Sequence, residues 1–121
     1  MDLRQCYDTF GGNYDETLKR MMNSEAMLKK FLLKFLSEGS FELLKNSLDT
    51  GDGATAFRAS HTLKGVCQNL GIDKLAAVSA ELTELLRDGT IPAEAASIME
   101  RVTAAYRETI DAIEVYQQTN M

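Results

Sequence analysis

The chain contains a single histidine, His61, and the residues around it are the best suited to chemistry. A neutral imidazole is a competent nucleophile near neutral pH. Lys64 follows three residues later and Gly65 four residues later, so on a helix both lie one turn from His61. The ammonium group would neutralise a negative group on the imidazole, and the missing side chain would let another molecule approach. This combination predicts that His61 accepts a phosphoryl group, because phosphoryl transfer depends mostly on positioning and charge neutralisation.

The segment 54–70 around these residues has the periodicity of an amphipathic helix. With about 100° of rotation per residue, its apolar stripe falls roughly 140–200° from His61. The stripe consists of Ala59, Leu63, Val66 and Leu70. The imidazole should therefore point away from the core. Glycine inside a helix costs about 1 kcal/mol relative to alanine, so we expect the outward-facing Gly65 to give access to the ring rather than to admit a closely packed helix.

Three more residues share or flank the outer face of this helix: Ala54, Phe57 and Arg58. An aromatic side chain exposed beside a reactive group often belongs to a docking surface. The three residues are therefore a candidate surface for a partner. Burial of Phe57 under the N-terminal arm is an equally good interpretation, and Arg58 is also explained as an ordinary solvent-facing arginine.

Polar side chains that could orient the imidazole lie on this helix and on the next one. Gln68 could hydrogen-bond the ring or a phosphoryl oxygen, or it could be a plain surface residue. Ser79 and Thr83 on the following helix carry hydroxyl groups that could reach the ring nitrogen on the bundle side. Such a bond would fix the tautomer of His61, which matters for a nucleophilic imidazole.

Other chemistries fit these residues poorly. Metal binding needs further ligands, but the positions one turn away hold Phe57, Arg58, Lys64 and Gly65, so we expect no metal site. Serine catalysis would pair Ser60 with its neighbour, yet adjacent helical residues point about 100° apart and no acid is placed to orient the ring. The sequence has no P-loop for a nucleotide. The divalent metal and the rest of the catalytic group would have to come from a partner.

The composition indicates one globular domain over residues 1–121. A net charge of -5 argues against nucleic-acid binding, which needs a basic patch. The two cysteines are far apart in sequence and suggest neither a disulfide framework nor a zinc site. No apolar run is long enough to cross a bilayer, and no secretory signal is visible. We expect a cytoplasmic monomer that does not bind membranes.

The distribution of apolar and helix-breaking residues predicts an all-α fold. We expect a short helix at about 15–22, helices at 24–37, 41–48, 54–70 and 73–85, and a long last helix with Pro92 in its first turn. Four of them, at 24–37, 54–70, 73–85 and the last, should form an antiparallel up-down four-helix bundle. The extra short N-terminal helix should pack across one end, and 41–48 should be a short extension.

The run Ala59-Ser60-His61-Thr62-Leu63-Lys64-Gly65, continued by Asn69-Leu70-Gly71 and by Leu75 and Leu82, resembles histidine-containing phosphotransfer (HPt) domains. The resemblance covers roughly residues 10–117 and implies a four-helix bundle. His61 would be the phosphorylated residue, with Lys64 neutralising the phosphoryl oxygens and Gly65 permitting access. Alanine is common where this chain has Ser60. Some relatives have a glutamine that bonds the histidine where this chain has Thr83, so that role would pass to Gln68.

The same resemblance implies a phosphorelay intermediate in two-component signalling. Such a protein exchanges its phosphoryl group with aspartates of response-regulator receiver domains, and a hybrid histidine kinase is a further expected partner. The receiver would supply the divalent metal, expected to be Mg²⁺, and no ATP site or kinase activity is expected in this chain. Two alternatives stay open: a phosphorylated domain of a larger chemotaxis-type or hybrid kinase, and a non-catalytic helical scaffold.

Overall fold

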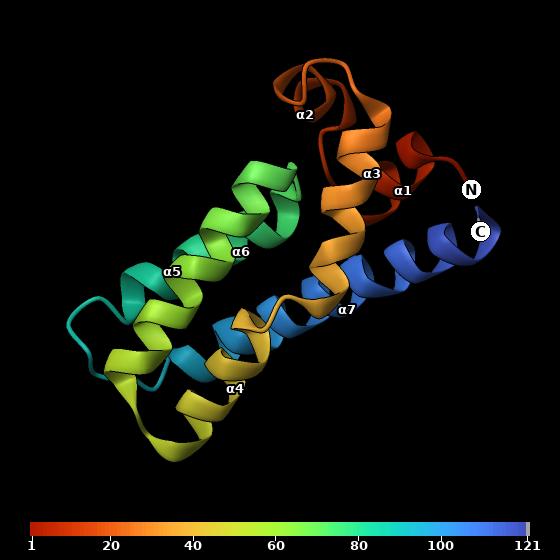
Figure 1. The fold of residues 1–121 in the computed structure, drawn as a ribbon. Helices are drawn as coiled ribbons and strands as arrows, with labels where there is room; N and C mark the ends of the chain where they lie inside the picture. The colour runs from red at the N-terminus through yellow and green to blue at the C-terminus, as the bar shows by residue number, and fades with distance from the viewer. Residues whose placement is uncertain (121) are drawn as a thin grey trace.

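The computed structural model describes residues 1–120, and these residues form helices and connecting turns without a β-strand. The elements are α1 (Leu3–Phe10), α2 (Tyr14–Arg20), α3 (Glu25–Lys34), the 3₁₀ turn η1 (Phe35–Ser37), α4 (Ser40–Thr50), α5 (Gly53–Leu70), α6 (Asp73–Leu85) and α7 (Ala95–Thr119). The predicted all-α bundle with short extra N-terminal helices is confirmed. Figure 1 shows α5 and α6 side by side, with α4 on the other side of α5 and the long α7 crossing beneath them.

The bundle position expected for 24–37 is divided between two helices. The α-helix ends at Lys34, and after η1 the backbone of Glu38 is extended, with φ -72° and ψ 125°. The chain then changes direction, and α4 packs along α5. Phe41 of α4 is buried and stacks on Tyr106 of α7 with ring centroids 3.9 Å apart. The segment expected to be a short extension is therefore a full member of the bundle.

Two turns determine where α5 ends and where α7 begins. Gly71 follows α5 in a left-handed conformation (φ 69°), and the N–H of Ile72 bonds the carbonyl of Cys67 at 2.9 Å. This is the glycine helix end expected from the sequence. Pro92 was expected in the first turn of the last helix, but α7 begins only at Ala95. Pro92 lies in the preceding turn, where its carbonyl accepts a bond from the N–H of Ala95 at 3.0 Å.

The N-terminal arm, residues 1–23, packs across the C-terminal end of α5. The Tyr7 hydroxyl donates to the carbonyl of Leu70 at 2.6 Å, and the Arg20 guanidinium donates to the carbonyl of Gln68 at 3.0 Å. These bonds satisfy carbonyl groups that a helix end leaves unpaired, and a cation is favourable there. The arm thereby fixes one end of the helix that carries His61.

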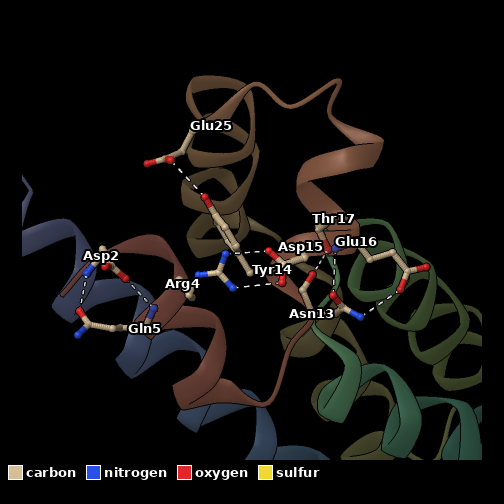
Figure 2. A network of polar contacts seen from close by, with 9 residues as sticks. All are labelled: Asp2, Arg4, Gln5, Asn13, Tyr14, Asp15, Glu16, Thr17 and Glu25. Carbon is tan, nitrogen blue, oxygen red and sulfur yellow. Dashed lines mark hydrogen bonds and ion pairs between the residues drawn. The ribbon is translucent and has the colours of Figure 1, made fainter.

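Polar contacts hold the arm itself together, as Figure 2 shows. Arg4 of α1 forms a two-bond ion pair with Asp15 of α2, at 2.8 and 3.1 Å. The hydroxyl of Tyr14 donates to Glu25 of α3 at 3.1 Å. These exposed contacts link three successive short helices, and each contributes little by itself because water screens exposed ion pairs.

Replacing Gly71 with alanine is expected to destabilise the fold by roughly 3 kcal/mol. The new side chain would occupy a left-handed conformation, and its Cβ would lie 1.8 Å from the Thr17 hydroxyl oxygen. Urea unfolding followed by circular dichroism measures the loss. Gly51→Ala is the matched control, since Gly51 has φ 77° with no atom near the added Cβ, and we expect about 1 kcal/mol there. Equal losses in the two variants would contradict close packing of the arm against Gly71.

Candidate functional site

His61 lies on the outer face of α5, as the helical periodicity predicts. Its side chain is exposed, whereas Ala59, Leu63 and Leu70 on the opposite face are buried in the core. No hydrogen bond joins the imidazole to another residue within 1–120. The ring therefore faces solvent from a helix that is held at both ends.

Phe57 is the closest ring to the imidazole. The two ring centroids are 6.0 Å apart and the ring planes are inclined by 22°. Phe57 is half-buried and packs against the core, and the guanidinium carbon of Arg87 lies 5.6 Å from the centroid of its ring. The N-terminal arm contacts the opposite end of α5, about 20 Å away along a helix of this length. Burial of Phe57 under the arm is therefore wrong.

Lys64 is half-buried between the histidine face and α6. No ion pair or hydrogen bond engages its ammonium group in the described chain. On α6, the pKa of Glu84 is lowered mainly by the hydrogen bonds and charge of Arg87 and more weakly by the charge of Lys64. The ammonium group is therefore available to a phosphoryl group on the adjacent imidazole.

Gly65 opens space beside the ring. A Cβ built on Gly65 would meet no atom of another helix within 4 Å. The alternative in which this glycine admits a tightly packed neighbouring helix is therefore wrong. What the glycine leaves open is the surface next to His61, as expected for a site that a second molecule must approach.

The hydroxyl groups proposed to orient the imidazole make no hydrogen bond to it, and that of Ser79 is buried without a partner within residues 1–120. Thr83 donates to the carbonyl of Ser79 at 2.7 Å and lies 3.1 Å from the hydroxyl of Ser60, which in turn is 3.0 Å from the carbonyl of Phe57. The side chains of Ser60, Ser79 and Thr83 are all buried. Ser60 and His61 are successive residues of α5, so their side chains point about 100° apart around the helix axis. The Thr83 hydroxyl therefore contacts α5 on the Ser60 side and not on the His61 side. The expectation that Ser79 or Thr83 orients His61 is therefore corrected.

Gln68 shares the outer face with His61 but does not contact it. The two residues are seven positions apart, which separates their Cα atoms by about 10 Å along the axis. Its side chain is exposed and makes no hydrogen bond within residues 1–120. Its possible role toward the phosphoryl group stays a prediction.

The remaining predicted surface residues extend the histidine face toward the start of α5. Ala54 and Arg58 are exposed, and Arg58 donates to the hydroxyl of Thr55 at 3.0 Å. Asp52 caps this end of the helix by accepting bonds from Thr55, which lower the pKa of the carboxyl group.

Sequence reasoning missed two residues near the site, Glu84 of α6 and Arg87 in the turn that follows α6. Arg87 donates to Glu84 from two guanidinium nitrogens and lies over Phe57. Their spacing of three residues is the spacing of a helical ion pair, although Arg87 lies just beyond the end of α6. Periodicity alone does not show that this pair meets α5 beside the histidine.

Other reactive groups lie away from the histidine face. Cys6 and Cys67 are buried free thiols, and burial raises the pKa of Cys6 to about 11. Residues 1–120 contain no cluster of three or more His, Cys, Asp or Glu side chains arranged to hold a metal ion. In the same part of the chain, no helix is long and apolar enough to cross a membrane.

Comparison with protein families gives one match that covers most of the chain. The family described as Hpt domain matches residues 31–115. This range contains α4, α5 and α6 whole, together with the histidine face. Comparisons with curated proteins and with solved structures gave no match.

Proposed function

Because this chain belongs to the Hpt domain family, whose members act in histidine phosphotransfer in two-component signalling, we propose that it is a phosphorelay intermediate that carries a phosphoryl group on His61. It takes this group from, or returns it to, an aspartate of a response-regulator receiver domain. The observation that supports this most is the open surface at Gly65 beside an exposed imidazole without a hydrogen-bond partner in residues 1–120.

The transfer step uses the unprotonated ring nitrogen of His61. This nitrogen attacks the phosphorus of an aspartyl phosphate, so an N–P bond forms while the P–O bond to the aspartate breaks. The bonding electron pair leaves with the carboxylate oxygen. In the reverse direction a receiver carboxylate attacks, and the electron pair of the N–P bond returns to the imidazole. Positioning and charge neutralisation are what the protein must supply for this reaction.

We assign the charge neutralisation on this side of the complex to Lys64. Its ammonium group is unpaired within the described chain and lies one turn from His61. The receiver is expected to bring Mg²⁺, which would neutralise the remaining phosphoryl charge. Gln68 is placed to bond a phosphoryl oxygen only if its side chain extends back along the helix.

Lys64→Ala is expected to slow phosphoryl transfer roughly tenfold, the effect of losing one charge-assisted interaction. The transfer rate is measured by rapid quench from a phosphorylated receiver. Lys30→Ala on α3 is the control, because it removes an exposed lysine from another helix. If both variants transfer at the wild-type rate, Lys64 is an ordinary surface residue.

The proposed function is tested by incubating the protein with a receiver domain that carries labelled aspartyl phosphate. We expect the label to move to this chain and to be lost in acid but retained in base, as an N–P bond requires. No transfer from any receiver of the same organism would contradict the proposal. The same site would serve a phosphorylated domain within a larger histidine kinase, whereas a non-catalytic scaffold would have no use for the open surface at Gly65.

The partners and setting of this function are also proposals. We propose receiver domains and a hybrid histidine kinase as partners, and a monomeric chain acting in the cytoplasm. Docking would use the face formed by Ala54 and Arg58 together with His61, since these three residues are exposed on α5.

A further inference from the structure

We propose that Phe57 is a positioning residue that holds the imidazole of His61 in the orientation required for transfer, and that Arg87 and Glu84 hold Phe57 in place. This inference rests on the proposed phosphotransfer function. It assigns the orienting role to an aromatic contact instead of a hydrogen bond.

The imidazole needs a means of orientation other than a hydrogen bond. The hydroxyl of Thr83 is bonded to the carbonyl of Ser79 and to Ser60, the hydroxyl of Ser79 is buried without a hydrogen-bond partner, and the imidazole has no hydrogen bond to residues 1–120. A nucleophile must approach in a defined geometry, and a small misplacement lowers the rate severely. The contact available to restrict rotation of this ring is the face of Phe57, inclined by 22° with a centroid distance of 6.0 Å.

Phe57 is itself held in place by its neighbours. A spacing of four residues brings any two helical side chains near each other, so proximity alone shows little. Here the ring of Phe57 also packs against the core, and Arg87 lies over it with the guanidinium carbon 5.6 Å from the centroid. Arg87 is in turn held by two hydrogen bonds to Glu84. The core and the turn after α6 therefore limit the motion of the Phe57 ring beside the imidazole.

The chain supplies a matched control for an aromatic residue beneath a cation. Phe31 of α3 is 38% exposed, and the ammonium group of Lys34 lies 5.5 Å from its ring centroid. It resembles Phe57 in residue type and in having a cation over its ring, but it lies on a different helix and contacts no histidine. Phe31→Leu therefore removes the same kind of side chain without affecting His61.

The contact is tested first by NMR on the unphosphorylated protein. Because the chain has one histidine, its ring protons give one unambiguous set of signals. We expect nuclear Overhauser effects between the ring protons of His61 and Phe57, and a clear change of the His61 ring shifts in Phe57→Leu but not in Phe31→Leu. Absence of these effects, or equal shifts in the two variants, would overturn the proposal. This result does not depend on whether His61 accepts a phosphoryl group.

The second test separates positioning from docking in single-turnover transfer at increasing receiver concentration. If Phe57 positions the imidazole, Phe57→Leu lowers the maximal transfer rate about tenfold and changes the half-saturating receiver concentration little. Phe57→Tyr keeps the aromatic ring and should transfer at the wild-type rate. Arg87→Gln should lower the maximal rate less than Phe57→Leu does. Phe31→Leu should transfer at the wild-type rate. If Phe57→Leu raises the half-saturating receiver concentration and leaves the maximal rate unchanged, Phe57 is a docking residue. If neither quantity changes, Phe57 has only a structural role. Either outcome overturns the proposal.

Discussion

Replacing His61 with glutamine is expected to abolish phosphoryl uptake while leaving the fold intact. The variant loses the only imidazole in the chain, and an amide nitrogen is not a nucleophile for phosphorus. Because the His61 side chain is exposed and makes no hydrogen bond within residues 1–120, its loss should change the free energy of unfolding by less than about 0.5 kcal/mol. Transfer from a labelled receiver and urea unfolding measure the two effects on the same sample.

Thr62→Ala is the control for this substitution. Thr62 is the adjacent exposed residue on α5, so its replacement disturbs the same stretch of helix without removing the imidazole. We expect normal uptake in this variant. Label on the His61→Gln protein would show that the phosphoryl group is carried by another residue.

Enlarging Gly65 is expected to block transfer without unfolding the protein. The structure has open space at this position, so a side chain would project over the surface beside His61 and not into a neighbouring helix. Gly65→Glu adds both bulk and a negative charge that repels the phosphoryl group, and we expect transfer to fall by at least about a hundredfold. Gly65→Ala should raise the free energy of unfolding by up to about 1 kcal/mol, because alanine favours the helix, while slowing transfer less than glutamate does.

These two variants distinguish access from packing. Circular dichroism and urea unfolding report stability, and rapid quench reports transfer. Ala26→Glu, at an exposed position of α3, controls for the added charge and should transfer normally. Loss of helicity in Gly65→Ala would mean that the glycine is needed for packing, and wild-type transfer in Gly65→Glu would mean that the partner does not approach this surface.

The sequence was sufficient for those features that depend on a single helix. The outward direction of His61, the burial of Leu63 and the helix end at Gly71 all follow from the rotation per residue and from local backbone preferences. The positions of Lys64 and Gly65 relative to His61 are set by the same helix. The structure therefore places His61, Lys64 and Gly65 on the helix that periodicity predicts, and their roles stay a prediction.

Features that depend on the relative rotation and register of two packed helices could not be predicted from helical periodicity. Whether Thr83 faces His61 or Ser60 depends on the rotation and register of α6 against α5, and periodicity defines only which face is apolar. The contact of Arg87 with Phe57 depends on the same register. The change of direction after Lys34 was missed because Phe35 and Leu36 continue the apolar spacing of α3, although the backbone leaves the α-helix there.

The most direct test of the account is to locate the bond to phosphorus. The protein is prepared with ¹⁵N-labelled histidine, which places the label in His61 because the chain has no other histidine. It is phosphorylated by a receiver domain and observed by ³¹P NMR. The account predicts a phosphorus signal split by coupling to ¹⁵N, and this signal should disappear in acid. A phosphorus signal without ¹⁵N coupling would place the group on an oxygen of another residue and contradict the account.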